Sequence, residues 1–383
     1  MTEVPEELRQ AKQAVEQELL GRPGVVGVDI GYKQVRGQPT QALAIRVHVN
    51  EKKDVPESER IPPAVGPFLT DVIERRYELH ATEAPPTAPQ RIDLNTYDPL
   101  VGGVSIGACR EVDGETFSGT LGAIVIDKDT GEPMLLSNFH VLAVNEQGTE
   151  GDLIAQPAVP DGGSCPRSVA GELVRRSLGG EVDCAVARAT RSVAPGVVDI
   201  GPVQGFEDAA LGQRVRKRGR TSGLTFGTVD AIDLTMKVDY KGNIGIVTLT
   251  NQVDVLPDTT KNGAFGAKGD SGSVLLTDDN KIVGLYTAGD VPSGSGVANP
   301  ISAVLRALNV DVLTAQNTTP GVPCQPPPPC VPPPCQPPPP CVPPPPCQQT
   351  QPDESQPKEA LPSPPDPPVE GELHGTTERR EMP

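Results

Sequence analysis

The sequence predicts a mainly β protein. From residue 101 onward, short apolar segments with strand-like alternation recur between glycine-containing turns, a pattern typical of a sandwich or barrels rather than of a parallel α/β sheet. The 383 residues are 36% hydrophobic, enough for more than one core. They also include 45 prolines and 40 glycines, too many to be spread evenly through packed domains. We therefore expect cores of short strands and a part of the chain that stays outside them.

Residues 1–81 predict a small α/β domain. A helix is expected after Pro5, because apolar residues then recur at helical spacing until Gly21 supplies a stop. The expected strands after it are residues 25–32, 43–49 and 68–77. His48 falls on the polar side of the second strand, so we expect it to be exposed. This domain should fold separately and contact the rest of the chain through a modest interface at most.

Residues 82–100 are rich in proline and threonine and read as a linker to the β domain, residues 101–316. The expected strands of that domain are residues 121–126, 134–137, 169–175, 182–188, 214–218, 224–234, 244–250, 273–276 and 282–287. Basic residues alternate around Val215, which favours the solvent face of a strand. One helix closes the domain, with Asn299 as its cap and Pro300 in its first turn.

Residues 317–383 form a tail in which five cysteines alternate with proline runs before an acidic end. Such runs adopt polyproline II, so we expect a semi-rigid spacer followed by a disordered segment. A second interpretation is a row of cysteines that cross-links to other chains, and it stays open. In either case the tail holds too little apolar side chain to join a core.

Composition excludes several classes of partner. A formal net charge of −17 argues against nucleic acid and anionic membranes, and no segment is apolar over the length of a bilayer. The start of the chain lacks a signal-peptide pattern, so we expect a cytoplasmic protein. Cys109, Cys165 and Cys184 are an odd number, which does not suggest a complete disulfide framework. Without Cys-x-x-Cys or paired histidines we expect no metal and no cofactor, and the oligomeric state stays open.

A glycine-flanked serine, Ser271, lies in the sequence Gly-Asp-Ser-Gly at residues 269–272. A serine nucleophile needs a base and a site for the oxyanion. The glycines let the backbone turn sharply and aim the N–H groups of Gly269 and Ser271 at one point, so the turn is a candidate oxyanion hole. The same four residues also suit an ordinary tight turn between strands, and only the partners of the serine can decide.

His140 is the one histidine of the β domain, and it directly follows an apolar strand. Because a serine nucleophile requires a base that is neutral near pH 7, we favour catalysis over a core position for His140. A carboxylate should orient the ring, and Asp183 at the head of a buried strand is the best candidate. The rivals in less apolar settings are Asp152, Asp161 and Asp199.

These residues resemble the chymotrypsin-fold, trypsin-like serine peptidases, and within them the bacterial branch similar to the plant NARROW LEAF 1 protein. The resemblance covers residues 102–313 in several motifs that follow the family order. The motifs are Gly-Thr-Leu-Gly at 119–122, Leu-Ser-Asn-Phe-His-Val-Leu at 136–142, Gln-Pro at 156–157, Asp-Gly-Gly at 161–163, Val-Asp at 182–183, Gly-Arg-Thr-Ser-Gly at 219–223, Gly-Thr-Val at 227–229, Gly-Asp-Ser-Gly-Ser at 269–273 and Ala-Asn-Pro-Ile at 298–301.

The resemblance implies two six-stranded antiparallel β-barrels joined near residues 201–208, with a triad of His140, Asp183 and Ser271 between them. It implies oxyanion donors at the N–H groups of Gly269 and Ser271. By analogy with the fold, the substrate-binding residues are Phe265, Lys268, Thr287, Ala288 and Gly289. None of these is a carboxylate, so a preference for small or apolar residues on the acyl side of the cut is expected.

Two positions depart from the family pattern. Phe139 stands where many relatives have a small residue before the histidine. In the trypsin group a newly freed N-terminus pairs with the acid before the serine, so Asp270 needs a different partner here.

The prediction is a serine endopeptidase that acts on polypeptides through an acyl-enzyme. The alternative is a peptidase-fold protein that cleaves poorly and acts as a peptide-binding or scaffolding module by strand addition.

Overall fold

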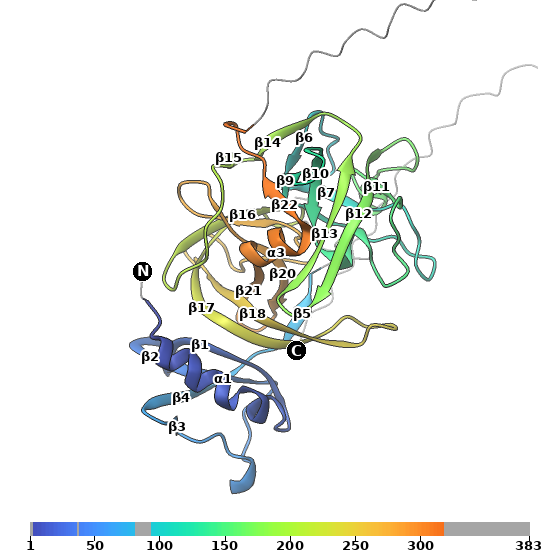
Figure 1. Cartoon of the computed structure of the whole chain (residues 1–383). Coiled ribbons are helices and arrows are strands. Elements are labelled where there is room, and N and C mark those ends of the chain that lie inside the picture. The colour runs from blue at the N-terminus through green and yellow to red at the C-terminus, as the bar shows by residue number, and fades with distance from the viewer. Residues whose placement is uncertain (1–2, 37, 81–92, 318–383) are drawn as a thin grey trace, which may run out of the picture. The chain divides into compact units, whose positions relative to one another are not determined.

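The computed structural model describes residues 3–36, 38–80 and 93–317 (Figure 1). The chain is mainly β, which confirms the predicted class. The expected tail lies outside the described residues apart from Asn317, and so does most of the expected linker.

The first barrel is an eight-stranded sheet in the order β22-β9-β10-β13-β12-β11-β7-β8. Its strands are β7 (Val104–Ala108), β8 (Gly119–Leu121), β9 (Ala123–Asp127), β10 (Pro133–Ser137), β11 (Leu153–Ala155), β12 (Val169–Gly179), β13 (Val182–Ala189) and β22 (Val310–Val312). Only Gly122 separates β8 from β9, so the chain itself closes the sheet. Residues such as Leu121, Leu135 and Ala185 point inward and are fully buried.

The second barrel closes through hydrogen bonds, because β16 pairs with both β17 and β19. Its strands are β16 (Arg214–Gly219), β17 (Gly223–Asp239), β18 (Ile246–Pro257), β19 (Val274–Leu276), β20 (Ile282–Asp290) and β21 (Ser295–Pro300). Phe265 and Tyr286 lie in its core. Helix α3 (Ile301–Leu308) then leads to β22, which pairs with β9 of the first barrel. The expected double antiparallel barrel is thus confirmed, but the sheet of the first barrel has eight strands instead of the expected six.

A short sheet connects the two barrels along the chain. It contains β6 (Leu100–Gly102), β14 (Val193–Val197) and β15 (Gly201–Pro202), and β14 pairs with both of the others. The expected join at residues 201–208 therefore begins in this sheet. The predicted domain boundaries stay predictions.

The N-terminal part is a helix on a sheet, as expected. Its elements are α1 (Glu6–Leu20), β1 (Val25–Val35), β2 (Gln38–Val49), the 3₁₀ turn η1 (Glu57–Glu59), β3 (Ala64–Val65), β4 (Phe68–Glu74) and β5 (Tyr77–Leu79). Leu8 and Leu19 on the apolar face of α1 are buried with Ile30 and Val47 of the sheet. Gly21 ends the helix, where its N–H donates to the carbonyl oxygen of Gln17.

The N-terminal sheet continues into the second barrel, which contradicts the expected modest interface. Strand β17 is long enough to pair with β1, for example Ile30 opposite Ile232 (Figure 1). The guanidinium of Arg46 is fully buried at this junction, where Nε lies 2.7 Å from Asp29 Oδ1 and Nη1 lies 2.6 Å from Asp230 Oδ2. Shared strands and buried charge pairs therefore join the two parts.

His48 is buried, so the prediction that it is exposed was wrong. Its Nε2 lies 3.0 Å from Asp29 Oδ2, and its Nδ1 contacts the hydroxyl of Tyr77. The sheet is covered on both faces here, by α1 on one and by these polar partners on the other. The polar face of β2, on which His48 lies, is consequently inside the protein.

Cys109 and Cys165 form a disulfide whose Cα atoms are 6.0 Å apart, while Cys184 is a buried free thiol. The odd number of cysteines thus reflects one bridge and one core residue. Burial and the charge of Asp183 raise the pKa of the Cys184 thiol well above its usual range. In the described part of the chain, no helix has the length and apolarity to cross a bilayer.

Candidate active site

The loop that carries Ser271 lies between the barrels. Backbone hydrogen bonds hold it from both sides, since Thr120 N–H donates to the Ser271 carbonyl oxygen at 2.7 Å and Gly272 N–H donates to that of Tyr286 at 2.9 Å. Gly272 has a φ of +93°, and a Cβ there would lie 2.1 Å from Ser137 Oγ and 2.3 Å from the Thr120 carbonyl oxygen. Only glycine fits this position.

His140 and Asp183 form a buried pair. His140 lies on the short helix α2 (Phe139–Leu142) directly after β10, and Asp183 lies near the start of β13. Nδ1 of His140 bonds to Asp183 Oδ2, and the His140 N–H lies 3.3 Å from Oδ1. Asp183 has no exposed surface and His140 is 4% exposed. The carboxylate thus holds the ring in one orientation, with Nε2 as the free nitrogen.

Three further side chains fix Asp183, and the sequence reasoning missed their role. The hydroxyl of Tyr240 donates to Asp183 Oδ2 at 2.6 Å, and Asn138 Nδ2 donates to the Asp183 carbonyl oxygen at 2.6 Å. Asn299 Oδ1 accepts from the Asp183 N–H at 2.6 Å. Asn299 was expected to cap α3, but it makes no side-chain cap there. Burial and the Asp183 charge raise the pKa of Tyr240 well above its usual value, so the hydroxyl stays a donor.

Ser271 and His140 are not hydrogen-bonded to each other in this structure. Ser271 Oγ instead donates to the carbonyl oxygen of Thr287 at 2.9 Å. Among the described residues, His140 Nε2 is buried and has no hydrogen-bond partner. A buried polar atom without a partner is costly, so Nε2 is suited to a hydrogen that a rotated serine or a ligand supplies.

Phe139 does not intrude on the histidine. Its side chain is 2% exposed and packs into the core of the first barrel. The guanidinium carbon of Arg176 lies 5.5 Å from the centre of its ring. The large side chain at position 139 is therefore accommodated in the core of the first barrel.

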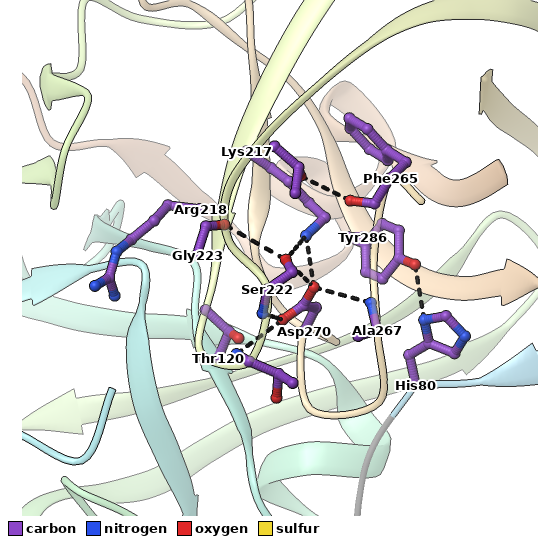
Figure 2. A network of polar contacts seen from close by, with 12 residues as sticks. His80, Thr120, Lys217, Arg218, Ser222, Gly223, Phe265, Ala267, Asp270 and Tyr286 are labelled. Atoms are coloured by element: carbon purple, nitrogen blue, oxygen red, sulfur yellow. Dashed lines mark hydrogen bonds and ion pairs between the residues drawn. The ribbon is translucent and has the colours of Figure 1, made fainter. Parts of the chain in front are cut away.

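Asp270 is paired with Lys217, as Figure 2 shows. Nζ of Lys217 lies 2.7 Å from Asp270 Oδ2, and neither side chain is exposed. The carboxylate also accepts from Ser222 Oγ at 2.5 Å and from the N–H groups of Thr221, Ser222 and Ala267 at 3.0 Å each. Burial alone would raise the pKa of Asp270, but Lys217 and these donors hold it below its ordinary value. Lys217 thus supplies the cation that Asp270 was expected to need.

The solvent face expected around Val215 was only partly correct. Arg214 is exposed, but Lys217 and Arg220 have no exposed surface. Arg220 Nε lies 2.7 Å from Asp161 Oδ2 on the first barrel, so this ion pair links the two barrels behind the serine loop. The pairing also gives a structural role to two of the motifs, Asp-Gly-Gly and Gly-Arg-Thr-Ser-Gly.

The expected substrate-binding residues lie on β20 and in the segment that leads to Ser271. Thr287, Ala288 and Gly289 are consecutive on β20, and Phe265 is buried with its ring 6.1 Å from that of Tyr286. Lys268 lies at the rim and is 61% exposed.

Gly269, the expected first oxyanion donor, has a φ of +102° and donates its N–H to the carbonyl oxygen of His80. A Cβ at Gly269 would lie 2.2 Å from Thr221 Oγ1, so glycine is required here as well. His80 was not expected in the site, and no local pattern marks it. In the described ranges, no group of three or more His, Cys, Asp or Glu side chains is placed to hold a metal.

Comparisons with known proteins point to one class. The family model described as Peptidase S7, Flavivirus NS3 serine protease, matches residues 267–300, the segment with Ser271 and all of β20. No curated protein matches the chain.

Solved structures that resemble the chain are serine proteases. Thermobifida fusca Protease A is 20% identical with a TM-score of 0.41, over 56% of this chain and 98% of that one. Cellulomonas bogoriensis chymotrypsin is 21% identical with a TM-score of 0.40, over 57% and 100%. A glutamic acid specific serine protease that uses a histidine triad in substrate binding is 22% identical with a TM-score of 0.40, over 56% and 100%.

Proposed function

We propose that the chain is a serine endopeptidase with His140, Asp183 and Ser271 as its triad, of the bacterial branch similar to the plant NARROW LEAF 1 protein. The observation that carries this proposal is the buried His140–Asp183 pair, in which His140 Nε2 has no hydrogen-bond partner among the described residues. Most buried polar side-chain atoms are hydrogen-bonded, and a buried ring nitrogen without a partner is therefore a candidate for a functional role.

The reaction begins when Ser271 Oγ turns from the Thr287 carbonyl oxygen to His140 Nε2. His140 takes the proton as Oγ attacks the scissile carbonyl carbon, and Asp183 stabilises the imidazolium. The N–H groups of Gly269 and Ser271 stabilise the oxyanion. His140 then protonates the leaving amine, and water hydrolyses the acyl-enzyme by the same steps in reverse order.

The test is a comparison of Ser271→Ala and His140→Ala with the wild type. Because the triad works as a unit, each variant should lower turnover by a similar factor, of order 10⁴ to 10⁶, without unfolding the barrels. A small fluorophosphonate probe reports the activated serine directly. Labelling that is no faster than that of Ser271→Ala, both in the wild type and in a variant whose substrate-binding strand is unblocked, would reject the enzyme.

One observation favours the second candidate, a peptide-binding module. The edge of β20 already accepts a strand, β5, by antiparallel pairing. A binding module would bind extended peptides with the same affinity in wild type and Ser271→Ala, and would turn over none of them.

A further inference from the structure

A segment of the chain itself lies on the expected substrate-binding strand. Strand β5 pairs antiparallel with β20, so that Glu78 lies opposite Gly289 and Leu79 lies opposite Ala288. The N–H of His80 continues the ladder towards the Thr287 carbonyl oxygen at 3.5 Å. This is strand addition, a recurring mode of peptide recognition in which an extended segment joins a strand by main-chain hydrogen bonds.

The carbonyl group of His80 contacts one of the two expected oxyanion donors. Its oxygen accepts the hydrogen bond from Gly269 N–H, the first of the two expected oxyanion donors. The donors of an oxyanion hole contact the carbonyl that is under attack and no other along the peptide. The His80 carbonyl oxygen thus occupies one expected donor in the way that the carbonyl of a scissile bond would.

The side chain of His80 lies beside Tyr286, as Figure 2 shows, in a buried position that we call the His80 pocket. His80 is 8% exposed, and its Nδ1 lies 2.8 Å from the Tyr286 hydroxyl. A Cβ at Gly289 would lie 2.3 Å from Cε1 of the ring, so the absent side chain at Gly289 makes room for it.

The charge states agree with this geometry. Burial lowers the pKa of His80 to about 4, so the ring is neutral at pH 7. Burial raises the pKa of Tyr286 well above its usual value, so its hydroxyl can donate to Nδ1. The pocket thus holds a neutral ring with one hydrogen bond, rather than the small or apolar residue expected from the sequence.

We propose that Tyr77–His80 is the enzyme's own first substrate, and that Ser271 cleaves the peptide bond between His80 and the next residue in the sequence, Ala81. The proposal rests on the proposed peptidase function and names a substrate for it. The cleaved segment then remains in the site as a product that blocks other peptides.

The chemistry balances with water alone. The Ser271 Oγ–H proton passes to His140 as Oγ bonds to the His80 carbonyl carbon, and the bond from that carbon to the Ala81 nitrogen breaks. The Ala81 nitrogen receives the proton and leaves as an amine. Water then adds to the acyl carbon, giving up a proton through His140, and releases a His80 carboxylate and free Ser271.

The two products should stay together after the cut. Strand β1 keeps its pairing with β17, and Lys237 Nζ donates to the Leu20 carbonyl oxygen at 2.6 Å. Arg46 keeps its bond to Asp230 across the same junction. Cleavage also turns the neutral His80 carbonyl group into a carboxylate, which accepts a stronger hydrogen bond from the Gly269 N–H. The N-terminal fragment is then a bound subunit rather than a released peptide.

The first experiment is intact mass spectrometry with N-terminal sequencing of purified full-length wild type and Ser271→Ala. The wild type should yield a fragment that ends at His80 and another that begins at Ala81, which co-elute in native gel filtration. Ser271→Ala should remain whole. Mixing the two proteins should leave Ser271→Ala uncut, because each cleft is filled by its own chain, and a cut there would overturn self-cleavage.

Variants test the pocket. His80→Asp places a carboxylate in a buried site that already faces Asp270, so the cut should slow by about 100-fold or more. Tyr286→Phe removes one hydrogen bond and should slow it about fivefold. The matched control is Ser58→Asp, which adds the same charge at an exposed position of η1 and should leave the rate unchanged.

Fluorophosphonate labelling separates the two proposals. His80→Asp should be labelled faster than the wild type, because its cleft is open. Labelling of Ser271 together with an uncut His80–Ala81 bond in the wild type overturns self-cleavage and leaves the peptidase intact. Failure of both proteins to be labelled rejects the peptidase, and self-cleavage with it.

Discussion

Acidification should release the segment Tyr77–His80 from the cleft. Burial is the main reason why the pKa of His80 lies at about 4 instead of 6.5. The charged and titratable groups around the ring act in both directions: Asp270 raises this pKa, whereas Lys217, Lys268 and His140 lower it. The bound ring therefore resists a proton that the released ring would accept.

The sign and size follow from these two pKa values. Above pH 6.5 both forms are neutral and the segment binds with full strength. As the pH falls from 6.5 towards 4, the released ring takes up a proton and the bound ring does not, so binding weakens. The binding equilibrium should fall about 30-fold at about pH 5, and about 300-fold once both forms are protonated.

The assay uses Ser271→Ala, in which the segment stays uncut and catalysis is absent. A dye-labelled peptide Tyr-Gln-Leu-Phe, which carries no titrating side chain in this range, competes with the segment for the cleft. Its apparent affinity, measured by fluorescence anisotropy, should rise about 30-fold between about pH 7.5 and about pH 5, because the competitor is released.

The matched control adds His80→Phe to the same background, so that the segment keeps a ring but loses the titration. The peptide should then bind with a nearly constant affinity across this range. An equal rise in both proteins would assign the effect to a group other than His80. No rise in either would refute the reasoning from the burial of His80.

Three further changes test the site and the fold. Lys217→Met leaves Asp270 buried without its cation and should lower the free energy of unfolding by about 3–5 kcal/mol, measured by urea denaturation; a loss below about 1 kcal/mol would contradict the buried pair. Tyr240→Phe removes a hydrogen bond to the charged Asp183 and should lower kcat/KM by about 10- to 100-fold with unchanged circular dichroism. Unchanged kinetics would show that this hydrogen bond does not contribute to catalysis. Cys109→Ser opens the disulfide loop and should cost up to about 4 kcal/mol of stability, read from the melting temperature with and without reductant; identical values in both conditions would mean that the bridge does not form.

Much of the fold was predictable because short stretches of sequence determine its helices and strands. Alternating apolar residues and glycine turns mark the strands, and the spacing after Pro5 marks α1. His140 was singled out by elimination and Asp183 by its buried strand, and the structure brings these two into contact. Their catalytic role with Ser271 stays a prediction.

The errors share a physical cause. Alternation separates the two faces of a strand but does not say what covers the polar face. His48, Lys217 and Arg220 all lie on faces that other parts of the chain cover, and each meets a carboxylate distant in sequence: Lys217 and Asp270, for example, are 53 positions apart. The position of His80 beside β20 could not be predicted from the sequence either, because it depends on where β5 ends in the folded structure.

The pairing of β1 with β17 also affects how the chain folds during synthesis. About 200 residues separate the two strands, so at 5–20 residues per second the edge of β1 waits ~10–40 s on the ribosome for its partner. During that interval its N–H and C=O groups form an open template for other strands. The N-terminal part is therefore made first but completed late, after β17 has been synthesised.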